Sequence, residues 1–204
     1  QAVAMEISSH ALDQCRCDGV RLAGAAFTNL SQDHLDYHAE MENYRRAKGR
    51  LFSELLPVNP DGVGVFNYDD PAGRRCAADS LARRNLSYAL ARSNADLHVE
   101  KVCVQTRGGM RINARWRDQP MLLETPLVGL FNVVNCLTAA GLALAVGIQP
   151  DAIVRGVAVM GGAPGRFEII QTRPFSVVVD YAHTPDSLLQ ALLNAKGMTR
   201  RRLI

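Results

Sequence analysis

Short apolar runs that alternate with amphipathic stretches constrain the fold of this chain more than any other feature. The runs "LAGAAF", "GVGVF" and "FSVVVD" each lead into a polar turn and then into a helical pattern. Strands separated by helices at this spacing are typical of a doubly wound, mostly parallel sheet. The sequence therefore predicts an α/β fold, and its 204 residues suffice for one large domain or one and a half ordinary ones.

The same patterns place the individual elements. The predicted strands of the main sheet cover 3–7, 24–30 and 62–66, and a later strand covers 175–180. The predicted helices cover 9–16, 41–56, 72–84, 132–146, 149–160 and 186–195. Residues 96–127 alternate in three short runs separated by the turns "TRGG" and "RDQP", which predicts a small antiparallel meander added to the sheet.

A segment rich in glycine and proline, "GGAPGRFE", is the best candidate for a linker. It precedes a new strand, loop and helix, which is how a further α/β domain begins. We therefore expect one domain over 1–163 and the start of a second over 164–204. The chain opens on a strand already in progress and stops after a helix, so we interpret it as a piece of a longer protein.

Composition excludes several classes of function. The net charge of +3, with basic residues scattered except in "TRRRL", does not favour nucleic acid. No apolar run could span a bilayer, and the start does not read as a signal peptide. Five cysteines without zinc-like spacing predict reduced thiols in a cytoplasmic protein, which we expect to be a monomer without nucleic-acid or membrane partners.

One lysine stands in an unusual place. On a helical projection of 41–56, one apolar stripe is formed by Tyr44, Ala47, Leu51, Phe52 and Leu55, and Lys48 falls in its middle. The simple interpretation is a snorkelling lysine whose stem covers apolar surface. The alternative is a functional lysine whose amine, neutral when buried, attacks an electrophile or takes up carbon dioxide as a carbamate beside a metal.

Polar residues follow two predicted strands. In "TNLSQDHLDYH", Asp33 and His34 come after the strand 24–30, where ligands of doubly wound sheets bind, so they suit a metal or a phosphate. Alternatively, Asp33 or Asp36 caps the next helix. Glu6 ends the strand 3–7 and is either an oxygen ligand for Mg²⁺ or a paired core carboxylate.

Further candidates lie in the second half of the chain. Asn132 and Asn135 are one helical turn apart; we expect Asn132 to be an N-cap, although two amides on one face could read a nucleobase. Asp180 ends a strand, and its carboxylate could bind a ribose hydroxyl or could simply be part of the loop. Arg166 in the linker could bind a phosphate. Thr184 followed by Pro185 predicts a helix N-terminus.

Six motifs together resemble the Mur ligases. "EISSHALDQCR", "TNLSQDHLDYH", "YRRAKGRLF", "GLFNVVNCLTAA", "GAPGRFE" and "VVVDYAHTPDSL" occur in the order and spacing of that family, from Val3 to about Leu192. The resemblance implies a central ATPase domain followed by the start of a Rossmann-like C-terminal domain. It implies ATP and Mg²⁺ as cofactors and an acyl-phosphate route to an amide bond. Among these ligases, the motifs resemble most those that add meso-diaminopimelate or L-lysine to UDP-MurNAc-L-Ala-D-Glu in peptidoglycan biosynthesis.

The resemblance also implies roles for single residues. Lys48 matches a carbamylated lysine that, with Glu6 and His34, helps to hold magnesium. Ser8, Gln14 and Arg16 match contacts to the UDP-muramoyl dipeptide. The ATP-site matches are Asn132 and Asn135 on the adenine side, Arg166 at a phosphate, Asp180 at the ribose, and Tyr181 and His183 in the same cleft.

The match is incomplete in one respect. No G-x-x-x-x-G-K-[ST] motif occurs, so we expect the phosphate-binding loop upstream of residue 1 and expect the 204 residues alone to be inactive. Other interpretations remain open: a sibling ligase such as a folylpolyglutamate or cyanophycin synthetase, a metal-dependent hydrolase using His34, Asp36 and His38, or a binding module without catalysis.

Overall fold

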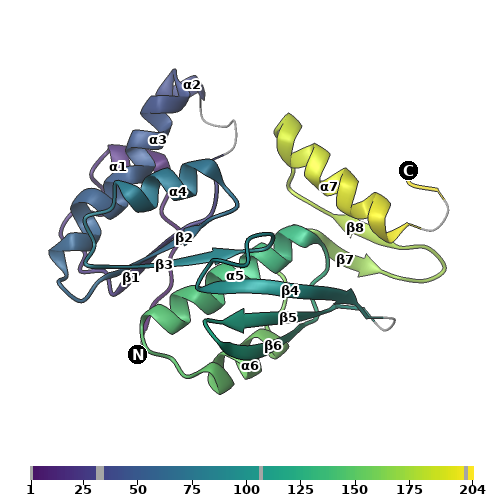
Figure 1. Cartoon of the computed structure of the whole chain (residues 1–204). Coiled ribbons are helices and arrows are strands. Elements are labelled where there is room, and N and C mark those ends of the chain that lie inside the picture. Colours follow the sequence, from purple (N-terminus) through teal and green to yellow (C-terminus); the bar gives the residue numbers. More distant parts are fainter. Residues whose placement is uncertain (1, 31–34, 106–107, 200–201) are drawn as a thin grey trace.

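A six-stranded sheet organises most of the molecule (Figure 1). The computed structural model describes residues 2–30, 35–105, 108–199 and 202–204. Along the sheet the strands follow chain order: β1 (Gly24–Phe27), β2 (Val63–Asn67), β3 (Arg84–Ala89), β4 (Leu97–Val104), β5 (Met110–Trp116) and β6 (Gln119–Thr125). Strands β1 to β4 pair in parallel, and β4 to β6 pair antiparallel. The predicted α/β fold and meander are therefore confirmed.

Strand β4 joins the parallel and antiparallel parts. It pairs with β3 only at Tyr88↔Leu97 and Ala89↔His98, so it begins where β3 ends. Parallel neighbours that overlap fully need a long crossover, whereas this small overlap needs only residues 90–96. The meander consequently extends the sheet beyond the carboxyl end of β3.

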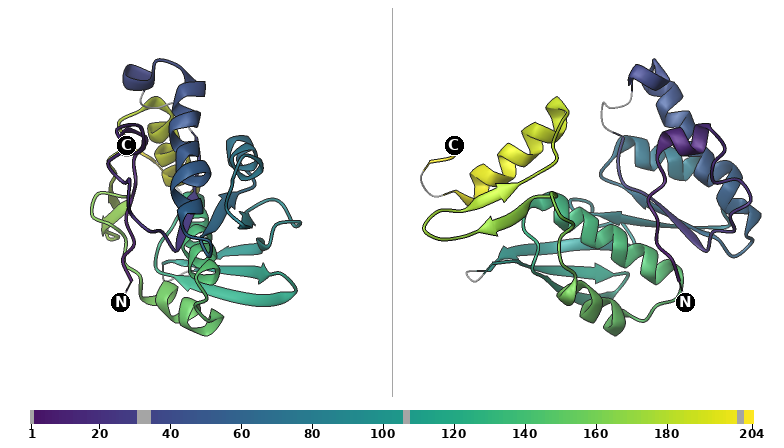
Figure 2. Two further views of the ribbon diagram at one scale, coloured as in Figure 1. Left: turned by 90° about the vertical axis from the view of Figure 1, so that its left-hand side faces the viewer. Right: turned by 180° about the vertical axis from the view of Figure 1, so that it is seen from behind.

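Helices cover both faces of the sheet (Figure 2). Helix α1 (Ser9–Asp13) precedes β1. Those between β1 and β2 are α2 (Leu35–His38), α3 (Met41–Arg50), the π-helical turn η1 (Leu51–Leu55) and the 3₁₀ turn η2 (Leu56–Val58). The others are α4 (Pro71–Ala78), α5 (Leu130–Ala145), α6 (Pro150–Val159) and α7 (Pro185–Met198). None of the helices in the described part of the chain has the length and hydropathy of a membrane span.

Strand β2 separates two hydrophobic cores. Val63 and Val65 belong to the core shared with α5 and α6, and Phe66 belongs to the core shared with α1, η1 and α4. Successive side chains of a strand point to opposite faces, so the fully buried pattern of β2 requires apolar cover on both. All five cysteines are free thiols, in agreement with the prediction.

The C-terminal part is attached differently. Strands β7 (Glu168–Gln171) and β8 (Val177–Val179) pair antiparallel, and α7 follows after a capping box in which Thr184 and Ser187 bond reciprocally. This confirms the predicted helix start, since Pro185 occupies the first turn. The contacts to α5 include the Leu130 amide, which donates to the Asn194 side chain at 3.0 Å, and the Phe131 and Phe167 rings, whose centroids lie 5.4 Å apart.

Two predicted elements are wrong. Residues 2–8 form no strand: Val3 and Met5 are 89% and 56% exposed, and in the described structure β1 pairs with β2 alone, so no ladder receives this segment. The helix predicted over 72–84 ends at Ala78, and Arg84–Ala89 is strand β3, which the sequence interpretation missed. At the end of the helix, the side-chain amide of Asn85 in β3 donates to the Ala77 carbonyl at 3.2 Å.

Candidate active site

Lys48 lies at the carboxyl end of β1, between aromatic rings. The whole predicted stripe of α3 and η1 is buried, and Lys48 itself is half-buried in it. Its Nζ donates to the Asn29 carbonyl at 3.0 Å and lies 4.9 Å from the ring centroid of Tyr44 and 5.8 Å from that of Phe27. These contacts hold the amine beside the chain segment that leads from β1 toward residues 31–34.

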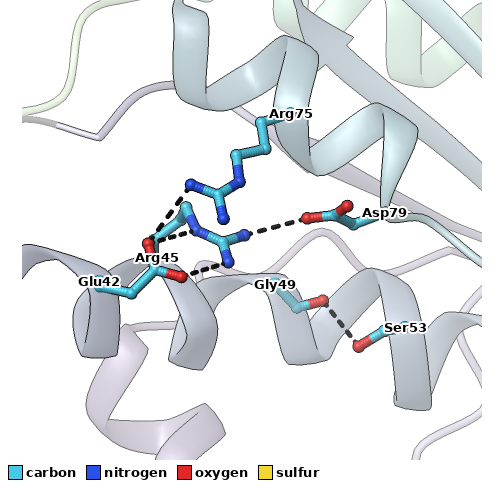
Figure 3. A network of polar contacts seen from close by, with 6 residues as sticks. All are labelled: Glu42, Arg45, Gly49, Ser53, Arg75 and Asp79. Carbon is cyan, nitrogen blue, oxygen red and sulfur yellow. Dashed lines mark hydrogen bonds and ion pairs between the residues drawn. The ribbon is translucent and has the colours of Figure 1, made fainter.

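An ion-pair network fixes the helix of Lys48 to α4 (Figure 3). Arg45 bonds Glu42 at 2.6 Å and Asp79 at 3.1 Å, while Arg75 approaches the same Glu42 at 3.5 Å. The hydrogen bond from Arg45 holds the pKa of the Glu42 carboxyl below its usual value, and Glu42 raises the pKa of Arg45. The network therefore ties one side of α3 to the helix that follows β2.

Arg50 ties the other side of α3 to α1. Its guanidinium donates to the Leu12 carbonyl at 2.7 Å, to Asp18 at 2.8 Å and to Glu54 at 2.6 Å. The hydrogen bond from Arg50 lowers the pKa of Asp18, and that same bond raises the pKa of Arg50. Lys48 is thus carried by a helix that is clamped between α1 and α4.

The predicted substrate contacts lie together at α1. Ser8 is the N-cap of this helix, and its hydroxyl accepts from the Ala11 amide at 3.2 Å. Gln14 donates to the Tyr37 hydroxyl at 3.2 Å and accepts from the Arg16 guanidinium. All three predicted residues are exposed, so a ligand can reach them.

The predicted metal ligands are not brought together by the described structure. His34 and Asp33 lie outside the described residues. Within 2–30, 35–105, 108–199 and 202–204, no group of three histidine, cysteine or acidic residues could hold a metal ion. Glu6 is exposed in the irregular segment 2–8, which contradicts the interpretation as a core carboxylate.

The His38 side chain is packed in the interior of the protein. Its ring is buried, and Nε2 lies 2.9 Å from the hydroxyl of the equally buried Ser9. The ring also stacks on Tyr44 at a centroid distance of 5.2 Å. This packing weighs against the metal-dependent hydrolase, which would need His38 as a ligand beside Asp36.

Asn132 does not cap α5, so that expectation is wrong. The N-cap is Gly129, whose φ of 93° few other residues adopt, and Asn132 lies three residues further on. Its buried amide donates to the Val128 carbonyl at 2.8 Å and accepts from Asn135 at 3.2 Å. The two asparagines therefore contact each other at the first turns of the helix, and Asn135 is exposed.

The remaining predicted residues gather on the C-terminal part. The Asp180 carboxylate accepts from the amides of Phe167 and Ala182, both at 2.8 Å. The Arg166 guanidinium lies 5.5 Å from the Tyr181 ring centroid, and His183 Nδ1 lies 2.9 Å from the Tyr181 carbonyl. The bonds of Asp180 to the backbone show that it shapes the loop. The Phe131–Phe167 contact brings this loop to the start of α5.

Comparison with known proteins defines the class. Residues 1–143 match the family model "Mur ligase middle domain", and residues 165–204 match "Mur ligase, glutamate ligase domain". The chain therefore belongs to the Mur ligase family.

Two curated relatives carry the same name. A protein of Solibacter usitatus (strain Ellin6076) is 41% identical over 99% of this chain, and one of Gloeobacter violaceus (strain ATCC 29082 / PCC 7421) is 43% identical over 98%. Both are named "UDP-N-acetylmuramoyl-L-alanyl-D-glutamate--2,6-diaminopimelate ligase". A solved structure with the same name in its title is 35% identical, with a TM-score of 0.78 over 93% of this chain and 39% of that one. The chain spans about 40% of the length of the curated relatives.

Proposed function

We propose that the chain is part of an ATP-dependent ligase that joins meso-diaminopimelate or L-lysine to UDP-MurNAc-L-Ala-D-Glu in peptidoglycan biosynthesis. The observation that carries this proposal is the identity of 41–43% over nearly the whole chain with relatives named as the diaminopimelate ligase. Those names favour diaminopimelate over lysine. Residues 1–163 would belong to the central ATPase domain, and residues 164–204 would begin the C-terminal domain.

In this proposal Lys48 acts as a carbamate. With Glu6 and His34 it would hold Mg²⁺, which when bound supplies positive charge next to the phosphates. An ammonium cannot bind a cation, whereas a carbamate offers the oxygen ligands that Mg²⁺ prefers. The contact between Nζ and the Asn29 carbonyl supports this role, because it places the amine beside the chain segment that runs to His34.

The other residues would bind and orient the two substrates. Ser8, Gln14 and Arg16 would hold the UDP-muramoyl dipeptide, and Asn132 and Asn135 the adenine side of ATP. Arg166, Asp180 and His183 would approach the nucleotide from the C-terminal domain. The glutamyl carboxylate would attack the γ-phosphorus of ATP, releasing ADP. The amine of the diamino acid would then attack the acyl carbon, lose a proton and displace phosphate. Cationic groups such as Arg166 would stabilise the charge on the phosphate oxygens.

The test is a Lys48→Ala substitution in the complete ligase that contains this chain. We expect a loss of ATP-dependent product, measured by mass spectrometry, on the order of 100-fold or more, as for other groups that stabilise transition-state charge. We also expect the loss of a carbamate signal in ¹³C NMR after equilibration with ¹³C-bicarbonate, and partial rescue of activity by short carboxylates. Lys101→Ala, which removes an exposed lysine of β4, is the matched control. Unchanged ligation by Lys48→Ala, or ligation by the 204 residues alone, would contradict the proposal.

A further inference from the structure

Four side chains, from α1, the turn that follows it and α2, form a directed hydrogen-bond chain. The Arg16 guanidinium donates to Gln14 Oε1, and Gln14 Nε2 donates to the Tyr37 hydroxyl at 3.2 Å. The Tyr37 hydroxyl in turn donates to Asp13 Oδ2 at 2.8 Å. Every donor therefore faces the same way, from the cation Arg16 to the anion Asp13, across 23 positions of sequence between Gln14 and Tyr37.

This direction leaves the Gln14 amide one orientation. A guanidinium only donates and a carboxylate only accepts, so both ends of the chain are fixed. Because its single proton is given to Asp13, the Tyr37 hydroxyl can only accept from Gln14. A flipped Gln14 would bring its NH₂ group against the Arg16 donors and its oxygen against an acceptor, losing two hydrogen bonds at once.

The ring of Tyr37 is itself held in place. Its centroid lies 4.2 Å from that of His10 on α1 and 4.8 Å from that of His38. His38 is buried, bonded to Ser9 and stacked on Tyr44 of α3, the helix that carries Lys48. The hydroxyl is therefore fixed relative to both α1 and α3.

We propose that Tyr37 is a positioning residue for the UDP-muramoyl dipeptide, acting through Gln14. It holds the Gln14 amide and, through it, the Arg16 guanidinium in the arrangement that receives the anionic substrate. This inference rests on the proposed function, which assigns Gln14 and Arg16 to that substrate. Tyr37 stands between Asp36 and His38 in the motif "TNLSQDHLDYH", in which the sequence interpretation gave Tyr37 no role.

The first test is Tyr37→Phe in the complete ligase, which keeps the ring and removes the hydroxyl. We expect KM for UDP-MurNAc-L-Ala-D-Glu to rise about 3- to 10-fold, the effect of one hydrogen bond. We expect kcat, KM for ATP and the melting temperature to stay at their wild-type values. Tyr68→Phe is the matched control, since Tyr68 is a half-buried tyrosine outside this cluster. An unchanged KM in Tyr37→Phe, or an equal rise of KM for ATP, would overturn the inference.

The second test asks whether Tyr37 acts through Gln14. In a Gln14→Ala background, Tyr37→Phe should raise KM no further, because the amide that it orients is absent. If the two effects multiply independently, the positioning role is wrong. Failure of the proposed function would look different, because the wild-type ligase would then neither bind nor use the UDP-muramoyl dipeptide.

Discussion

Arg50 forms ion pairs with both Asp18 and Glu54, and its bond to Asp18 leads to a prediction of how stability depends on pH. The hydrogen bond from Arg50 lowers the folded-state pKa of Asp18 below its unfolded value. A carboxyl group whose pKa is lower in the folded state stabilises the fold above its unfolded-state pKa. This stabilisation is lost as the pH falls through the folded-state pKa. We therefore expect the free energy of unfolding to decrease as the pH falls below about 4.

Urea unfolding between pH 7 and pH 3 measures this dependence. Arg50→Met keeps much of the stem and removes the guanidinium, so part of the acid sensitivity should disappear. Arg83→Met is the control, because Arg83 is an exposed arginine outside the network. The same slope in Arg50→Met as in the wild-type chain would show that the Asp18 contact does not influence stability.

For single residues, the sequence predicted that Lys48 lies on the apolar face of its helix, but it did not predict the contacts of Tyr37 and Arg50. The place of Lys48 follows from helical periodicity, which is local. The hydroxyl of Tyr37 meets Asp13 and Gln14 from more than twenty positions away, and Arg50 meets Leu12 from 38 positions away. Such pairings depend on how α1 packs on α2 and α3. Asn132 shows the same limit, because Gly129 rather than Asn132 begins α5.

Among the elements, α4 packs so closely on the end of β2 that only glycine fits at one position. A Cβ added at Gly73 would lie 2.1 Å from the Asn67 carbonyl oxygen, a backbone atom that cannot rotate away. We expect Gly73→Ala to lower the free energy of unfolding by about 1–3 kcal/mol, the usual cost of overpacking. Thermal or urea unfolding of the chain measures it.

Gly156→Ala in α6 is the matched control. A Cβ there meets nothing within 4 Å, so the gain in helix propensity should stabilise the chain by up to about 1 kcal/mol. Opposite signs at the two glycines would support the close packing of α4 on β2. A Gly73→Ala variant that is as stable as the wild-type chain would contradict it.

The elements that the sequence predicted best are those with local end signals. Thr184 and Pro185 mark the start of α7, and the alternation of 96–127 marks the meander. The wrong predictions concern segments whose secondary structure is determined by tertiary contacts. The apolar residues of 3–7 fit a strand but have no partner strand in the described sheet. "LARR" fits a helix, yet the Leu81 amide donates to the Phe52 carbonyl at 3.2 Å, and the chain turns into β3.

Across the whole molecule, apolar side chains are buried mainly around the six-stranded sheet and much less in the C-terminal part. The sheet has a core on each face, whereas α7 has no buried residue and its leucines 188, 189, 192 and 193 are 47–54% exposed. Figure 1 shows α7 on the opposite side of the molecule from α1 to α4, reaching the main sheet through the start of α5. The C-terminal part is therefore stabilised mainly by its own short hairpin and helix.

This difference in burial predicts which part of the chain unfolds locally first. Local opening has a low free energy where few apolar contacts are buried, so amides of β7, β8 and α7 should exchange hydrogen at least about tenfold sooner than those of α5. Asn194→Ala should accelerate exchange in α7 further, because it removes the bond from the Leu130 amide, while exchange in β2 stays unchanged. Hydrogen exchange followed by mass spectrometry of the 204-residue chain measures both effects. Equal protection of α5 and α7 would mean that the chain unfolds as one cooperative unit, with the contacts of Asn194 and Phe167 sufficient to couple its two parts.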